Sequence, residues 1–236
     1  MRKNPFLIML VVTAFGCSMQ AQKTDRVRIE GSGNLITKEF PVKSFDELSA
    51  SGVFELKLSQ GDKEQVKIEA EDNLMELFTV ENNGSKLDIH MKKDVDLNTK
   101  KKMTVYVIFK NLKSMDLQMV GGTSSEEQLK FSDLKLKNQS VGSVNLDMTL
   151  QTLNLENESV GSLKLKGSAD NAIIKSNGVG GVNAADFIVQ KMDIENNGVG
   201  GATVNAEKEL KVSDSFLGKV NNKGNATAKR KNKVVI

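Results

Sequence analysis

Acid–base chemistry in this chain would depend on one histidine and a set of dispersed carboxylates. His90 is the single histidine of the 236 residues and stands between Ile89 and Met91. This apolar–polar alternation predicts an outward position on a strand. No Ser-His-Asp, Cys-His or metal-ligand spacing accompanies it. We therefore expect no catalytic, cofactor-binding or metal-binding residue.

Polysaccharide cleavage is the enzymatic alternative. A glycosidase or lyase needs paired carboxylates, or an acid beside a base, on neighbouring strands of one face. The outward acids of the second half do not recur at one constant spacing along the chain. They are Asp147, Glu156, Asp170, Asp186, Asp193 and Glu195. A pectinase-like or lyase-like enzyme therefore stays open as the alternative to a non-catalytic protein.

These residues stand on an internal repeat of about twenty residues, which runs from Phe131 to Asn225. Each copy centres on a small tetrapeptide: Ser140-Val141-Gly142-Ser143, Ser159-Val160-Gly161-Ser162, Gly178-Val179-Gly180-Gly181, Gly198-Val199-Gly200-Gly201 and the degraded Phe216-Leu217-Gly218-Lys219. The central glycines are 19, 19, 20 and 18 positions apart. Regular spacing at this period is typical of stacked architectures.

Apolar residues recur at constant distances from each glycine. Six positions before it stand Leu136, Leu155, Ile174, Ile194 and Val212, and directly before it stand Val141, Val160, Val179, Val199 and Leu217. Alternation around these columns predicts two short strands per copy, with the apolar side chains inward. We expect an all-β fold, a right-handed parallel β-helix (solenoid) with coils of about twenty residues.

The tetrapeptides predict corners between strands. Glycine permits the unusual φ and ψ and the close backbone approach that a corner needs, so we expect a structural role for Gly142, Gly161, Gly180, Gly200 and Gly218. Asparagines cluster beside the corners at Asn138, Asn157, Asn177 and Asn197. An Asn ladder, with amides bonded between coils, is the favoured interpretation, and a ligand-binding row is the alternative.

The first half is rich in strands but irregular. Alternating or apolar runs at 53–58, 87–91 and 105–109 predict strands, and 72–78 predicts a helical turn. The charged segment 94–102 predicts an exposed loop. Because no Pro-rich or Gly-rich linker separates the halves, we expect one continuous structure with a strand-rich half at 22–115 and a repeat half at 116–236.

The first 21 residues predict an export signal. Arg2 and Lys3 precede the apolar run 6–15, which is too short to span a bilayer. Cleavage after Ala21 and lipid attachment at Cys17, the single cysteine, both remain open. Removing Arg2 and Lys3 lowers the formal charge from +3 to +1, which indicates no nucleic-acid partner.

Five short motifs follow one another in the first half: Gly31-Ser32-Gly33-Asn34, Phe45-Asp46-Glu47-Leu48, Ser51-Gly52-Val53-Phe54, Leu58-Ser59-Gln60-Gly61-Asp62 and Glu71-Asp72-Asn73-Leu74. In these motifs and in their order, the chain resembles the head GIN domain family of auto-transporter adhesins. The resemblance implies a right-handed β-helical fold and a secreted or envelope protein of a bacterium.

We therefore expect an exported, non-catalytic adhesin or surface-binding protein. Its place would be the periplasm, the outer membrane or the cell surface, and its partner a surface glycan or a protein whose identity is open. Contact with a membrane is expected if Cys17 is lipidated.

Overall fold

The computed structural model describes residues 27–230, so the predicted export signal and Cys17 lie outside the described residues. The first-half elements are β1 (Val27–Glu30), β2 (Leu35–Phe40), β3 (Glu47–Val53), β4 (Glu55–Gln60), β5 (Gln65–Glu71), the 3₁₀ helix η1 (Asp72–Leu77), β6 (Phe78–Asn83), β7 (Lys86–Met91), β8 (Val95–Asn98) and β9 (Thr104–Phe109). The second-half strands are β10 (Ser114–Val120), β11 (Thr123–Ser125), β12 (Leu129–Lys130), β13 (Asp133–Asn138), β14 (Val144–Asn157), β15 (Leu163–Ser176), β16 (Val182–Asn196), β17 (Ala202–Asp214), β18 (Val220–Asn222) and β19 (Ala228–Arg230).

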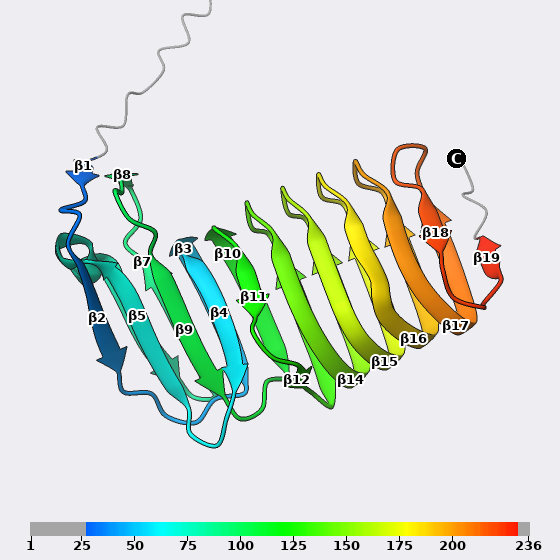
Figure 1. The fold of residues 1–236 in the computed structure, drawn as a ribbon, viewed down its shortest axis with the longest axis horizontal. Coiled ribbons are helices and arrows are strands. Elements are labelled where there is room, and N and C mark those ends of the chain that lie inside the picture. Colours follow the sequence, from blue (N-terminus) through cyan, green and yellow to red (C-terminus); the bar gives the residue numbers. More distant parts are fainter. Residues whose placement is uncertain (1–26, 231–236) are drawn as a thin grey trace, which may run out of the picture.

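Seventeen of these strands belong to one sheet, and β1 and β8 form a separate parallel pair (Figure 1). In the first half, β3 pairs in parallel with both β7 and β10, and β4 with both β9 and β11. Three pairs are antiparallel: β2–β5, β5–β9 and β6–β7. Because β3 and β4 contact β10 and β11 directly, the sheet passes from one half to the other without a break.

From β13 to β17 each strand pairs in parallel with the next one along the chain. The register places Leu136, Leu155, Ile174, Ile194 and Val212 directly opposite one another, and none is more than 1% exposed. The predicted burial of this column is confirmed. Parallel pairing aligns equivalent positions of successive strands, so an apolar column in the sequence becomes a continuous row of the core.

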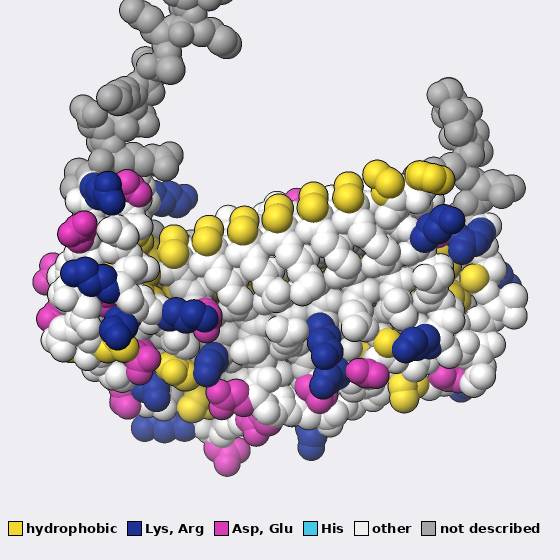
Figure 2. Space-filling view, turned by 45° about the horizontal axis from the view of Figure 1, so that its top comes forward, with side chains coloured by type: hydrophobic (Ala, Val, Ile, Leu, Met, Phe, Trp, Pro, Cys, Tyr) yellow, Lys and Arg dark blue, Asp and Glu magenta, His cyan; other side chains and the backbone are white. Residues whose placement is uncertain are grey.

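The apolar residue directly before each corner glycine lies outside the core, and its predicted inward direction is wrong. Val141, Val160, Val179 and Val199 are 50–52% exposed, and Leu217 is 60% exposed. Figure 2 shows a row of hydrophobic side chains along the upper edge of the molecule. The chain turns at these positions, so the simple alternation of an uninterrupted strand does not apply there.

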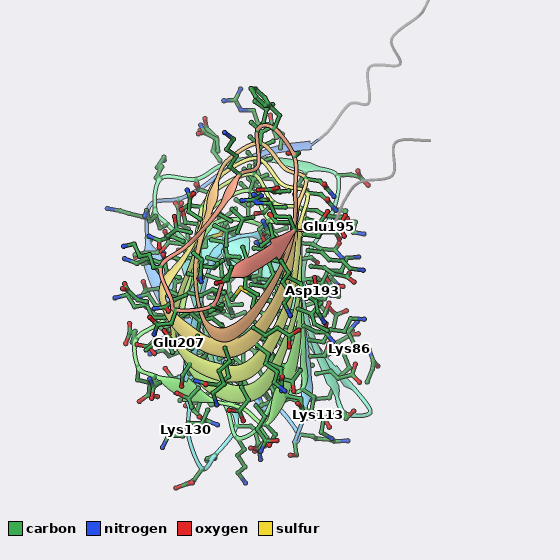
Figure 3. All side chains as sticks on the ribbon, turned by 90° about the vertical axis from the view of Figure 1, so that its right-hand side faces the viewer. Lys86, Lys113, Lys130, Asp193, Glu195 and Glu207 are labelled. Atoms are coloured by element: carbon green, nitrogen blue, oxygen red, sulfur yellow. The ribbon has the colours of Figure 1, made fainter. Side chains whose placement is uncertain are left out.

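The predicted right-handed parallel β-helix is wrong for this chain. The described residues form one seventeen-stranded sheet of mixed order, in which antiparallel hairpins are inserted among parallel pairs. Seen along the long axis, this sheet curls around the core as a nearly closed, barrel-shaped wall (Figure 3). The spacing of the glycines identified neighbouring strands in the second half, but it held no information on pairing in the first.

Local elements also differ from expectation. The second half has one long bent strand between successive corners, of 13 to 15 residues in β14–β17, in place of two short ones. The ladder continues through β15 even at Gly167, which has φ +101° and still pairs with Met148. The predicted loop 94–102 contains the short strand β8, whereas the predicted helical turn is present as η1. Within residues 27–230, no helix has the length and apolar character of a transmembrane span.

Glu71 fastens the beginning of the described chain to the sheet. Its fully buried carboxylate accepts backbone N–H bonds from Gly33, from Lys100 at 2.7 Å and from Lys101 at 3.0 Å. Burial raises the pKa of Glu71, but these N–H donors outweigh burial and hold the pKa below its ordinary value. The side chain thereby links the segment before β2 to the loop before β9.

Candidate binding groove

The corner glycines approach one another through their backbones. Gly142, Gly161, Gly180 and Gly200 have φ between +130° and +146°. A Cβ on any of them would lie 2.1–2.5 Å from the carbonyl oxygen of the preceding corner glycine. Gly218 differs, because its Cβ would meet the carbonyl oxygen of Asn196 at 2.5 Å. At the first four corners a side chain would meet both an unfavourable φ and a backbone oxygen, whereas at Gly218 it would meet the oxygen alone.

A buried polar row runs beside the corners. Asn138 donates to Asn157 at 2.8 Å, and Asn157 donates to Ser176 at 3.3 Å. Asn196, the next member in register, donates to the carbonyl of Gly218 at 2.7 Å. Two predicted members, Asn177 and Asn197, are exposed and stand one position after this row. Counting four positions back from each corner glycine would have selected Ser176 and Asn196.

The outward acids alternate with lysines across the sheet. The register places Lys175 between Glu156 and Glu195, and likewise Lys166 between Asp147 and Asp186. Opposite charges in neighbouring positions stabilise a sheet, whereas like charges there repel. Asp193 and Glu195, labelled in Figure 3, lie on β16 and face the register positions of Lys211 and Ser213 on β17. Along these rows of the sheet, Asp147, Glu156, Asp186 and Asp193 therefore stand opposite lysines on the neighbouring strand.

His90 lies on β7 as a half-exposed side chain. Its Nδ1 is 3.6 Å from Oδ2 of Asp88, two residues earlier on the same strand. Among residues 27–230 no group of three or more His, Cys, Asp or Glu side chains is arranged to hold a metal ion. Within that range, the polar groups best arranged to bind a ligand lie in a groove away from His90.

A groove of about 890 Å³ opens where the two halves of the sheet meet. Its walls come from the segment before β3, the turns before β5 and β7, the β9–β10 connection, the start of β13 and the second half of β14. Backbone bonds hold these segments together: Asp46 N–H donates to Ser85 at 3.0 Å, Lys113 N–H to Asp46 at 2.7 Å and Lys135 N–H to Lys113 at 2.8 Å. The walls of the groove are therefore fixed by the fold.

The groove has an apolar base and a polar rim. Phe45, Leu112 and Leu134 are buried at its base. Phe131 is half-buried there and stacks on Phe109, with ring centroids 5.7 Å apart and an interplanar angle of 13°. A fixed aromatic ring with one side toward a groove provides an apolar surface for a ligand.

Two ion pairs stand on the rim. Lys113, labelled in Figure 3, is 2.8 Å from Asp46, and Lys110 is 3.8 Å from Glu64. Hydrogen bonds from Lys113 and Ser85 lower the pKa of Asp46, and the bond to Asp46 raises the pKa of Lys113. Both groups of this exposed pair therefore keep their charges across a wide pH range.

Other polar side chains of the rim are free to meet a ligand. Within residues 27–230, the side chains of Asn111, Asp133, Lys135 and Asn154 have no hydrogen-bond or ion-pair partner. They supply amide, carboxylate and ammonium groups to the lining of the groove. Convergent donors and acceptors above an apolar base are typical of a binding site.

Sequence reasoning missed the groove and one corner. Val120-Gly121-Gly122 has the same form as Val179-Gly180-Gly181, and Gly121 has φ +148°. That similarity could have found the corner, although it stands 21 positions before Gly142. No sequence signal could have found the groove, because its residues come from segments up to about a hundred positions apart.

The described residues form an all-β protein with a groove between two parts of one sheet. The chain belongs to the head GIN domain family, since the family model described as "Putative auto-transporter adhesin, head GIN domain" matches residues 44–226. This range includes every segment of the groove. The expected family is therefore confirmed. A comparison with curated proteins gives no match.

Solved structures of bacterial proteins share the fold. A protein of Bacteroides fragilis described as a putative adhesin is 27% identical, with a TM-score of 0.74 over 86% of this chain and 99% of that chain. A putative adhesin of Parabacteroides distasonis is 20% identical, with a TM-score of 0.62 over 86% and 95%. A putative lipid binding protein of the same species is 17% identical, with a TM-score of 0.59 over 87% and 100%. The last two show likeness of fold alone.

Proposed function

We propose that this protein is an exported, non-catalytic adhesin of a bacterial cell envelope, which binds a glycan segment in the groove beside Phe131. Family membership and the similarity to the Bacteroides fragilis protein support the adhesin class. The basic start and short apolar run of residues 1–21 support export. The periplasm, the outer membrane and the cell surface are all places consistent with this role.

The observation that carries the ligand class is the set of unpaired polar side chains around one aromatic ring. Sugar hydroxyls both donate and accept hydrogen bonds, so they suit a rim that offers Asn111, Asp133, Lys135 and Asn154 together. The half-buried ring of Phe131 supplies an apolar face for the carbons of a pyranose. The rim also carries both charge signs, which fits a neutral glycan better than a strongly charged one.

Binding of the full-length protein to arrays of glycans and matrix proteins tests the proposal. We expect binding to a glycan, and we expect the double substitution Asp133→Ala and Asn154→Ala to weaken it about tenfold or more. The matched control is Asp170→Ala with Asn171→Ala, two exposed residues on β15 outside the groove. Equal losses in both variants, or capture of matrix proteins alone, would contradict the proposal.

Mass spectrometry of the captured glycan separates binding from cleavage. An adhesin returns the glycan at its original length after prolonged incubation. Shortened products, formed at a rate that depends on the purified chain, would favour a polysaccharide-active enzyme and overturn the non-catalytic assignment.

A further inference from the structure

A straight apolar ridge follows the corners. It consists of Val120, Val141, Val160, Val179, Val199 and Leu217, which we call the Val ridge. Its valines are 50–53% exposed, and parallel bridges join each valine to the next. Figure 2 shows the continuous line of hydrophobic side chains. Consecutive members are one strand spacing apart, about 4.8 Å, so the Val ridge is about 24 Å long.

The surroundings of the Val ridge are small and nearly uncharged. Two positions after the valines stand Gly122, Ser143, Ser162, Gly181 and Gly201. Two positions before them stand Gln118, Gln139, Glu158, Asn177 and Asn197. Covering the ridge would therefore remove few charges from water, and desolvation of charge is the main cost of burying a surface.

The backbone under the Val ridge is already paired. Gly142 N–H donates to Val160 at 2.9 Å, and Val160 N–H donates to Ser140 at 2.9 Å. The same pattern repeats at the following corners, where Gly161 donates to Val179 and Gly180 to Val199. An apolar phase could thus cover the ridge without leaving these backbone donors unpaired.

A second copy of the chain is a poor occupant of this surface. A stable dimer buries about 800 Å² on each partner. A ridge one side chain wide and about 24 Å long offers much less than this area. A lipid bilayer, by contrast, can accept a narrow convex ridge, because aliphatic side chains insert into the boundary between headgroups and acyl chains.

The sequence of residues 1–26 indicates that the apolar phase near the Val ridge is a lipid bilayer. Residues 1–26 contain the apolar run 6–15 and Cys17, and they join the structure at Val27. Figure 1 shows β1 at the same side of the molecule as the corners. Ten residue steps separate Cys17 from Val27 and span at most about 35 Å. A membrane attachment in this segment would hold the Val ridge within reach of the same bilayer.

We propose that the Val ridge is a membrane-contacting edge, which rests on a lipid bilayer and inserts its aliphatic side chains between the headgroups. A single weak attachment gives reversible membrane binding, and a second contact stabilises it. Exposed Phe216 and Lys219 flank Leu217 and extend the contact with one aromatic ring and one cation. The β9–β10 connection, which lines the groove, lies at the edge opposite the corners (Figure 1), so the groove would face away from the bilayer.

A tryptophan reporter tests contact at the ridge directly, because the chain contains no tryptophan. Full-length protein with Val179→Trp or Ile188→Trp is mixed with vesicles of phosphatidylcholine and phosphatidylglycerol, with and without brominated acyl chains. We expect the emission of Val179→Trp to shift to the blue and to fall at least twofold with brominated lipid. Ile188→Trp, at a 45% exposed position on β16 outside the ridge, should show neither change.

The leader is identical in both reporters, so it cannot produce a difference between them. Unchanged Val179→Trp emission in vesicles that sediment with the protein would overturn the proposal. So would equal quenching of both reporters.

Vesicle affinity supplies the second measurement. Val160→Asp with Val179→Asp should weaken vesicle binding about tenfold, whereas Ile173→Asp with Ile188→Asp, at 44% and 45% exposed positions, should change it less than twofold. Circular dichroism and the urea midpoint show that each variant is folded. Equal affinities, or a lipid-free dimer that the ridge substitutions dissolve, would contradict a membrane edge. Glycan capture by the groove is measured separately, so failure of either proposal can be distinguished from failure of the other.

Discussion

Replacing a corner glycine by alanine should destabilise the fold far more than replacing glycine elsewhere. At Gly161, φ is +144°, a conformation that costs a residue with a side chain about 1–3 kcal/mol. The new methyl group would stand 2.2 Å from the carbonyl oxygen of Gly142, inside a hydrogen-bonded ladder. Forcing these backbones apart adds about 1–3 kcal/mol, so we expect Gly161→Ala to cost about 2–6 kcal/mol.

Two glycines provide matched controls. Gly84 has φ +64°, and a Cβ there would meet nothing within 4 Å, so Gly84→Ala should cost about 1 kcal/mol from conformation alone. Gly181 holds the position that Ser143 and Ser162 hold at earlier corners, and Gly181→Ser should change stability by less than about 0.5 kcal/mol.

Urea unfolding followed by circular dichroism gives the free energy of unfolding for each variant. Dichroism is the suitable signal because the chain has one tyrosine and no tryptophan. A difference of less than about 1 kcal/mol between Gly161→Ala and Gly84→Ala would refute the reasoning, since it would show that close approach of the backbones contributes nothing beyond conformational strain.

Two further substitutions test buried polar groups. Glu71→Gln should lower the urea midpoint most at neutral pH. The pKa of Glu71 is depressed in the folded state, so the ionised carboxylate stabilises the fold above the unfolded pKa, and this stabilisation is lost as the pH falls. Urea unfolding at pH 7 and at pH 4 should therefore show a smaller difference between variant and wild type at pH 4. Asn157→Ala should cost about 2–3 kcal/mol because it removes the oxygen that accepts hydrogen bonds from the buried Asn138 amide and the buried Ser159 hydroxyl. Exposed Asn177→Ala should cost less than about 0.5 kcal/mol. Equal effects of the two asparagine substitutions in urea unfolding would contradict the buried row.

Much of the second half could be predicted from the order of residues. The column of Leu136, Leu155 and Ile174 is buried because parallel pairing at a constant offset places like positions side by side. The corner glycines were located by spacing alone, although their φ and close contacts were not. In the first half no constant offset exists, and the pairing of β3 with β7 and β10 was not predictable from local patterns.

The sequence by itself determined that the chain is all-β, that the column from Leu136 to Val212 fills the second-half core, where the corners stand and to which family the chain belongs. The tertiary structure decided the mixed strand order, the outward direction of the Val ridge and the existence of the groove. The physical reason is range. Alternation and spacing act between neighbouring residues and neighbouring strands, whereas a sheet's order and a groove's walls depend on segments distant in sequence that meet when the whole sheet closes around its core.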